Sequence, residues 1–184
     1  MLLPTLLTPV VIGLIGVLTL NPDFGVIGQL LNRLGLVQGA VLGNSDTALL
    51  AIIAVDTYQW TPFVAVILTA GLLALPKEPY EAAQVDGASR IQTFFRVTMP
   101  LLWQYFVVAI LIRVIDAFRI FDIIWVMTRG GPGTATEAVA VYAYRHTFRY
   151  WDLGYGSALI MVIFVFISIL VEYLYKALQK WQTA

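Results

Sequence analysis

The sequence contains no cysteine, a single histidine, His146, and few charged side chains of either sign. The absence of cysteine excludes disulfides and thiol chemistry. One histidine is too few for a histidine-based metal site. Charged residues make up 12% of the chain, and 11 basic side chains balance 11 acidic ones. This balance argues against a nucleic-acid partner, which would favour a basic surface.

The chain is rich in long apolar runs. Hydrophobic residues make up 60% of its 184 positions, and the mean hydropathy is +0.83. A helix rises about 1.5 Å per residue and the bilayer core is about 30 Å thick, so runs of about 20 apolar residues predict spanning helices. We expect one all-α domain over residues 1–184, a polytopic transmembrane helix bundle with about four spans. The expected spans are 2–20, 47–75, 101–127 and 158–178.

The connections between these spans carry most of the polar residues. Residues 21–46 place Ile27, Leu30, Leu31 and Leu34 on one helical face, which predicts a short interfacial helix. Basic residues favour the side that holds residues 76–100 and the C-terminus by five to four, so we predict that this side is cytoplasmic. The five are Lys77, Arg90, Arg96, Lys176 and Lys180; the four are Arg33, Arg129, Arg145 and Arg149.

Residues 76–100 read PKEPYEAAQVDGASRIQTFFRVTMP and predict two short helices joined by a turn. Pro79 suits a first helical turn, and the following YEAAQV consists mainly of helix formers. Gly87 allows a sharp bend or the close approach of another backbone. The small residues leave room for a partner, and Glu81, Asp86 and Arg90 offer charges that orient it. From composition alone, a solvated loop is the competing interpretation.

The order of residues in this segment resembles the EAA motif of permease subunits of bacterial ABC importers. The motif runs Glu-Ala-Ala, three residues, Gly, nine residues, Ile, one residue, Leu-Pro. Here Glu81-Ala82-Ala83 is followed by Gly87 and then by Val97, Met99 and Pro100, with the same spacing. The surroundings NPDFG, WTPF, RVIDAFRIFDIIWVMTRGGPGTATE and DLGYGSA are similar to the carbohydrate-importing branch of the binding-protein-dependent transport system inner membrane components.

This resemblance implies that residues 76–100 form a cytoplasmic coupling helix pair that docks on an ATPase subunit, where the Glu81 position usually forms an ion pair. The implied docking residues are Glu81, Ala82, Ala83, Asp86, Gly87, Ala88, Arg90 and Pro100. ATP hydrolysis belongs to a separate polypeptide, because this chain has no G-x-x-x-x-G-K-[ST] loop to hold phosphates. We therefore expect no enzyme activity, catalytic residue, cofactor or metal in this chain.

The resemblance further implies a multi-pass protein of the bacterial cytoplasmic (inner) membrane that imports a sugar, oligosaccharide or polyol by alternating access. Its expected partners are a second permease subunit, two ATP-binding subunits, an extracytoplasmic solute-binding protein and the lipid bilayer. Permeases of this branch generally carry two further spans before the matched region. Since Met1 lies within an apolar run that has no basic flank, we expect the sequence to be N-terminally incomplete, either as a fragment or through a late translation start.

Polar residues inside the expected spans indicate either a solute path or pairing between helices. Asp56, Gln59, Trp60 and Phe63 share one helical face, and so do Arg113, Asp116, Ala117 and Ile120. Aromatic rings beside polar groups suit a sugar. By the resemblance, the path comprises Gln59, Trp60, Phe63, Arg113, Asp116, Ala117, Ile120 and Asp122. The alternative is structural: Arg113 with Asp116, and Arg119 with Asp122, are i, i+3 pairs that can neutralise each other.

Other residues favour simpler roles. Glu172 and Tyr173 suit the inner membrane boundary, and His146 suits an outer loop without catalytic work. The outer aromatic residues are read either as a boundary belt or as a docking surface for a solute-binding protein; they are Tyr142, Tyr144, Phe148, Tyr150 and Trp151. Rival functions are an importer of amino acids or peptides, an ion-gradient-driven secondary carrier, for which we find no internal repeat, and a membrane hydrolase, for which motifs are missing.

Overall fold

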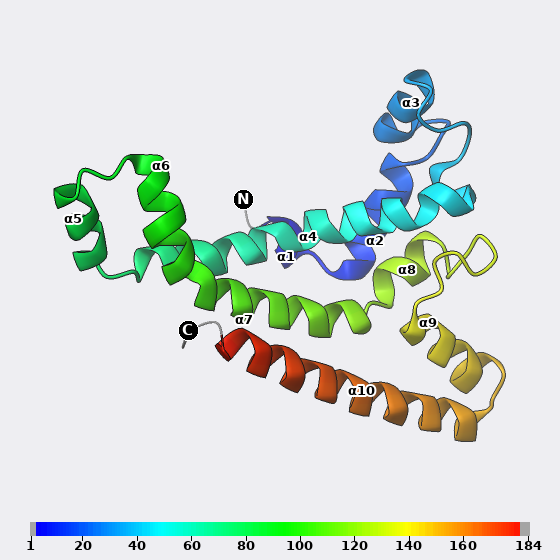
Figure 1. Ribbon diagram of the computed structural model, residues 1–184. Helices are drawn as coiled ribbons and strands as arrows, with labels where there is room; N and C mark the ends of the chain where they lie inside the picture. The colour runs from blue at the N-terminus through cyan, green and yellow to red at the C-terminus, as the bar shows by residue number, and fades with distance from the viewer. Residues whose placement is uncertain (1–2, 181–184) are drawn as a thin grey trace. The chain divides into compact units, whose positions relative to one another are not determined.

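The computed structural model describes residues 3–180, with side chains up to residue 176, and every regular element within that range is a helix (Figure 1). The predicted all-α class is confirmed. The chain forms two compact units. Unit 1 comprises the described residues up to Pro62 together with Asp116–Ile167, and unit 2 comprises Phe63–Ile115 with the described residues from Ser168 onward.

Unit 1 is built around an apolar cluster contributed by several short helices. Its elements are α1 (Leu3–Leu6), α2 (Pro9–Thr19), α3 (Val26–Arg33), η1 (Val41–Gly43), the first part of α4 (Ser45–Leu73), the end of α7 (Met99–Phe118), α8 (Asp122–Met127), α9 (Val139–Tyr144), η3 (Arg145–Arg149) and the first part of α10 (Leu153–Lys180). Helix α2 packs against α8. The buried cluster is Leu20, Val41, Ala51, Ile52, Ile123, Ile124, Met127 and Val141.

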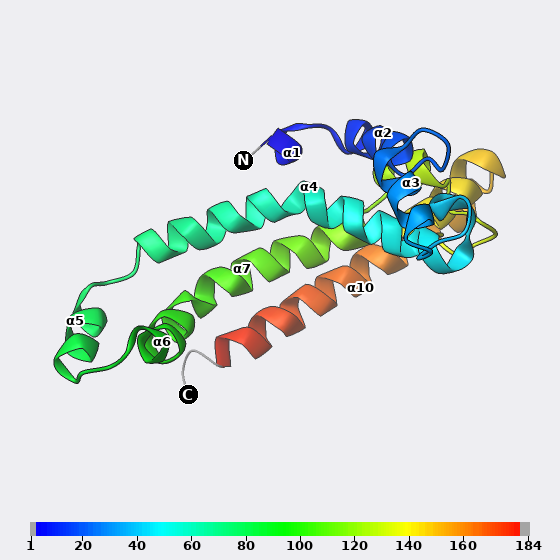
Figure 2. The ribbon, with the colours of Figure 1, turned by 90° about the horizontal axis from the view of Figure 1, so that it is seen from above.

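Unit 2 holds the polar segment between two long helices. It contains the end of α4, α5 (Glu78–Val85), α6 (Arg90–Thr93), the π-helical turn η2 (Phe94–Thr98), most of α7 and the end of α10 (Figure 2). Helices α4 and α7 approach closely at Gly71. A Cβ atom on Gly71 would clash with the ring of Tyr105, so this approach requires a residue without a side chain.

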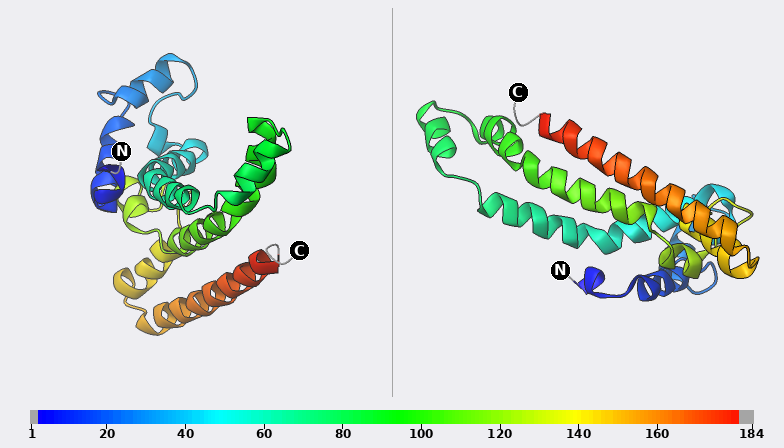
Figure 3. Two further views of the ribbon diagram at one scale, coloured as in Figure 1. Left: turned by 90° about the vertical axis from the view of Figure 1, so that its left-hand side faces the viewer. Right: turned by 90° about the horizontal axis from the view of Figure 1, so that it is seen from below.

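Three helical runs among the described residues are long and apolar enough to cross a membrane: Ser45–Leu73, Arg90–Phe118 and Leu153–Lys176 (Figure 3). They correspond to the expected spans 47–75, 101–127 and 158–178, with shifted ends. The expected first span, 2–20, begins outside the described residues and is interrupted. Thr8 is extended, with φ −66° and ψ 148°, because Pro9 disfavours helical geometry in the residue before it. The longer piece, Pro9–Thr19, has only 11 residues.

The third expected span also differs at both ends. It stops at Phe118 rather than residue 127, since Phe121 has φ −129° and ψ −55°, and α8 starts anew with Asp122 in its favourable first turn. At the other end the helix continues back to Arg90. Pro100 does not interrupt it, because the wide turn of η2 precedes it and the Met99 amide bonds to the carbonyl of Phe94, five residues back. The side chain of Lys180, used above for orientation, lies outside the described residues.

Candidate functional site

The segment at residues 76–100 folds as the predicted pair of short helices. Helix α5 starts at Glu78, with Pro79 in its first turn, where the missing amide costs no helical hydrogen bond. Glu78 and Glu81 also lie in this first turn, where negative charge opposes the positive helix end. The composition of α5 and the position of Pro79 thus explain why a new helix begins at Glu78, shortly after α4 ends at Leu73.

The turn after α5 is a Schellman motif that depends on Gly87. The Ala88 amide donates to the Ala83 carbonyl at 2.9 Å, and the Gly87 amide donates to the Gln84 carbonyl at 3.1 Å. Gly87 has φ +70°, a left-handed conformation that other residues rarely adopt. Nothing lies within 4 Å of a Cβ atom built on it. Of the two roles considered from the sequence, the structure therefore supports the bend and gives no sign of a close approach within this chain.

Helix α6 begins with a capping box that the sequence analysis missed. The Gln92 amide donates to Oγ of Ser89 at 3.3 Å, and the Ser89 amide donates to Oε1 of Gln92 at 2.9 Å. The signal is present in the sequence as Ser-x-x-Gln. Together with the Schellman turn, this cap fixes both ends of the connection between α5 and α6.

A hydrogen bond ties α5 to the start of the following span. The hydroxyl of Tyr80 donates to Oγ1 of Thr98 in η2 at 3.1 Å, and Thr98 is buried. Neither residue was singled out from the sequence, because their separation of 18 residues gives no local signal. The bond gives α5 a fixed place beside the helix that continues into α7.

Most of the predicted docking residues lie on the surface of this segment. Glu81, Ala82, Asp86, Gly87, Arg90 and Pro100 are exposed, Ala88 is half-buried, and Ala83 is buried. Three apolar side chains of the same segment are largely exposed, which a loop that only contacts water would not favour. Val85 is 89% exposed, Ile91 72% and Phe95 65%. An apolar patch rimmed by charges is typical of a surface that contacts another protein.

The predicted solute-path residues of α4 differ in burial. Gln59 is only 2% exposed and donates from Nε2 to the Leu7 carbonyl at 3.2 Å. Trp60 and Phe63 are half-buried. The path assignment of these residues stays a prediction. For Gln59, the bond to the backbone favours the structural alternative.

The remaining path residues come from α7, α8 and the connection between them. Arg113 and Asp116 are half-buried on α7, and Ala117 is exposed. Ile120 packs against the apolar cluster of unit 1. Asp122 is exposed at the start of α8, after the break that follows Phe118, so it does not share a helix with Arg119 as the i, i+3 pairing assumed.

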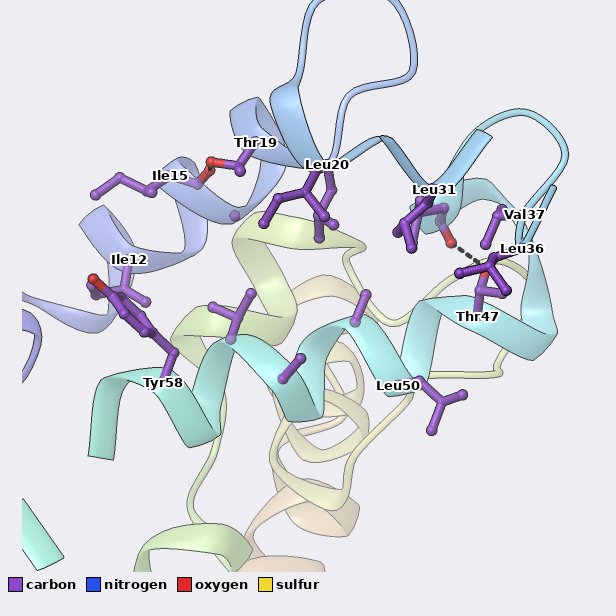
Figure 4. A pocket seen from close by; sticks show the side chains of 16 residues that line it. Ile12, Ile15, Thr19, Leu20, Leu31, Leu36, Val37, Thr47, Leu50 and Tyr58 are labelled. Atoms are coloured by element: carbon purple, nitrogen blue, oxygen red, sulfur yellow. Dashed lines mark hydrogen bonds between the residues drawn. The ribbon is translucent and has the colours of Figure 1, made fainter. Parts of the chain in front are cut away.

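Unit 1 also contains an apolar cavity of about 700 Å³ between α2, α3 and α4 (Figure 4). Ile12, Leu20 and Val55 are among the aliphatic side chains that line it, and polar atoms come from Thr19, Thr47 and Tyr58. None of the eight predicted path residues lines this cavity. A lining with so few hydrogen-bonding groups suits an apolar occupant better than a sugar.

The loop after α8 is held by one arginine. Nη1 of Arg145 forms an ion pair with Oε1 of Glu137 at 2.5 Å, and Nη2 donates to the Arg129 carbonyl at 2.7 Å. The Arg145 and Glu137 side chains are 20% and 13% exposed, so the pair is largely shielded from water. This clamp organises the Gly-Pro segment between Arg129 and Glu137.

Three tyrosine rings pack around His146 in the segment from α9 to the start of α10. Its ring lies 4.5 Å from that of Tyr142, 5.2 Å from Tyr150 and 4.8 Å from Tyr155. The pKa of Tyr142 is raised above its ordinary value, mainly by the hydrogen bond between its hydroxyl and that of Tyr155. The cluster is partly open to solvent, and the choice between a boundary belt and a docking surface stays undecided.

The whole chain matches a known family. Residues 1–183 match the family described as binding-protein-dependent transport system inner membrane component. The sulfoquinovosyl glycerol transport system permease protein SmoG of Agrobacterium fabrum is 44% identical over 153 residues, 83% of this chain and 49% of the relative. The trehalose/maltose transport system permease protein MalF of Thermococcus litoralis is 41% identical over 147 residues, 80% of this chain and 50% of the relative. The chain thus spans about half the length of these curated relatives.

Solved structures share the fold. A bacterial ABC transporter involved in the import of the acidic polysaccharide alginate matches with a TM-score of 0.85 and 23% identity, over 97% of this chain and 63% of the other. A bacterial alginate ABC transporter in complex with an alginate pentasaccharide-bound periplasmic protein matches with a TM-score of 0.85 and 22% identity, over 98% and 63%. At this identity the likeness establishes the arrangement of helices alone.

Proposed function

This chain belongs to the family of binding-protein-dependent transport system inner membrane components, and from that membership we propose that it is a permease subunit of an ATP-driven importer of a sugar, an oligosaccharide or a related polyol. The curated relatives SmoG and MalF are named for transport of a sulfoquinovosyl glycerol and of trehalose and maltose. Their names support the carbohydrate class of solute.

The observation that carries the proposal is the exposed pair α5 and α6 between two membrane-spanning runs. A polar segment that served only as a connection would not need three exposed apolar side chains, and the Schellman turn and capping box hold the two helices that carry them. We infer that these features form a docking surface for an ATP-hydrolysing subunit. Full burial of an exposed apolar side chain of this size contributes about 1.5–3 kcal/mol, so Val85, Ile91 and Phe95 can together supply a large part of the docking energy.

The proposed mechanism is alternating access. ATP binding closes the paired ATPase subunits, α5 and α6 move with them, and the attached α4 and α7 open the path toward the outside. Hydrolysis and release then return the spans to the inward-open state. The solute is delivered by an extracytoplasmic binding protein, and a second permease completes the path. In this arrangement the chain lies in the bacterial inner membrane, with residues 76–100 and the C-terminus in the cytoplasm.

Site-specific cross-linking tests the docking surface. The chain has no native cysteine, so one introduced thiol gives an unambiguous product. Ala83 is buried, whereas Val85 is 89% exposed, so Val85→Cys is the better site for the cross-linker. In native membranes we expect Val85→Cys to capture an ATP-hydrolysing subunit, and Thr134→Cys, exposed on the loop after α8, to capture none. Equal capture at both sites, or none at Val85→Cys, contradicts the docking role.

Transport assays test the coupling itself. In the assembled transporter, Glu81→Lys reverses the charge expected to pair with the ATPase subunit and should abolish ATP-linked uptake without changing membrane insertion. Glu78→Lys, in the same first helical turn, is the matched control for general loss of negative charge. Normal uptake by the Glu81→Lys variant would remove Glu81 from the coupling role.

A further inference from the structure

The break between α1 and α2 leaves the Leu7 carbonyl without its usual helical donor. In a continuous helix the Val11 amide would donate to the Leu7 carbonyl. Here Thr8 is extended, and its hydroxyl oxygen accepts from the Val11 amide at 3.4 Å instead. The segment is apolar, and within a bilayer such a carbonyl needs a partner from the protein.

Gln59 of α4 supplies that partner. Its Nε2 donates to the Leu7 carbonyl at 3.2 Å, and the residue is 2% exposed. This bond also fixes the orientation of the amide, because the opposite orientation would place Oε1 against another acceptor. The position of Gln59 therefore depends on a backbone group 52 residues away in the chain.

A second hydrogen bond runs in the opposite direction. The hydroxyl of Thr5 in α1 donates to the Gln59 carbonyl at 2.9 Å. Pro62 lies within α4 and provides no amide, so the Tyr58 carbonyl, next to Gln59, loses its usual helical donor. Gln59 and residues 5–7 are thus joined by two hydrogen bonds, one in each direction.

We propose that Gln59 is a positioning residue that holds residues 5–8 against α4 near Pro62, instead of contacting the transported solute. Its Oε1 is buried and has no hydrogen-bond partner among the described residues, so the described side-chain hydrogen bond of Gln59 is the one that Nε2 donates to Leu7. Through this clamp Gln59 sets the direction of the next residue, Trp60, which the sequence assigns to the solute path. The two hydrogen bonds that form this clamp, Gln59 to Leu7 and Thr5 to Gln59, are seen in the structure. The effect of the clamp on transport rests on the proposed function.

Hydrogen exchange in the assembled transporter tests the clamp independently of transport. Gln59→Leu keeps the volume and removes the donor, so the amides of Val11 and Ile12 should exchange about fivefold to tenfold faster, as expected for one lost hydrogen bond. Thr69→Val is the matched control, because the Thr69 hydroxyl bonds to Ala65 in its own helix. Unchanged exchange in Gln59→Leu, or equal acceleration in Thr69→Val, overturns the proposal.

Uptake kinetics separate positioning from solute contact. Gln59→Leu and Thr5→Val should each lower the maximum rate and leave KM and the order of accepted solutes unchanged. Their effects should combine to less than the product, because both remove one shared clamp. Thr5→Ser keeps the hydroxyl and should retain the wild-type rate. An altered order of solutes in Gln59→Leu overturns the proposal. If the wild-type transporter moves no solute, the proposed function fails, and the exchange measurement still decides the clamp.

Discussion

Replacing Gly87 by alanine should destabilise the turn between α5 and α6 by about 1–2 kcal/mol, the cost of placing an ordinary residue in the left-handed conformation. The observed φ of +70° requires that conformation, and the space around the Cβ position is open, so no steric clash adds to the cost. Asparagine tolerates left-handed geometry better than alanine although it is larger. The expected order of stability is therefore Gly, Asn, Ala and then the β-branched Val.

Two assays examine this order at different levels. Hydrogen exchange at the Ala88 amide, which donates to the Ala83 carbonyl, reports the turn itself. A loss of about 1.4 kcal/mol corresponds to about tenfold faster exchange. ATPase activity of the assembled transporter, stimulated by the solute-loaded binding protein, reports coupling. We expect both quantities to follow the same order across the variants.

The comparison of Asn with Ala decides between two explanations of the glycine. If Gly87 is needed for its backbone conformation, Gly87→Asn is milder than Gly87→Ala in both assays. If Gly87 instead admits the close approach of a partner subunit, the larger Asn is more harmful than Ala to ATPase stimulation. That reversal, or exchange at Ala88 that is indifferent to all three substitutions, would refute the argument from backbone conformation.

Three further substitutions test other contacts. Ser89→Ala removes the capping box and should destabilise the start of α6 by about 1 kcal/mol, measured by exchange at the Gln92 amide. Gly71→Val places a side chain against the Tyr105 ring and should lower the thermal stability of the purified complex, whereas Gly71→Val combined with Tyr105→Ala should recover part of it. Glu137→Gln removes the charge partner of Arg145 and should increase proteolysis in the loop after α8, and unchanged cleavage would show that the carbonyl contact to Arg129 suffices.

Much of the fold could be predicted from the sequence because apolar length is a strong signal. The runs beginning near Ser45 and Leu153 were found with errors of only a few residues at their ends. The pair α5 and α6 was also predicted, since Pro79 and Gly87 mark a helix start and a turn directly. These features depend on residues that are neighbours in the chain.

The predicted ends of the spans were wrong where the local preference of a residue is outweighed by contacts with more distant residues. Pro9 breaks the first apolar run into two helices, although the apolar composition of the run predicts one span. The break after Phe118 contains no glycine or proline from which it could be predicted. The span expected to start at residue 101 continues back to Arg90, because the π-helical turn before Pro100 lets the helix pass through it. The bond between Tyr80 and Thr98 and the bond from Gln59 to Leu7 join residues 18 and 52 positions apart, so no pattern in one sequence could reveal them.

The fixed attachment of α5 has a mechanical consequence. Helix α5 is bonded through Tyr80 to the start of the α7 run, and α7 in turn meets α4 at the side-chain-free surface of Gly71. A displacement of α5 therefore moves both long helices together. A flexible connection in the same place would absorb part of that displacement. In the proposed transporter, stiffness at this junction, more than the binding energy at the docking surface, limits how much of the motion of an ATPase subunit reaches the membrane helices.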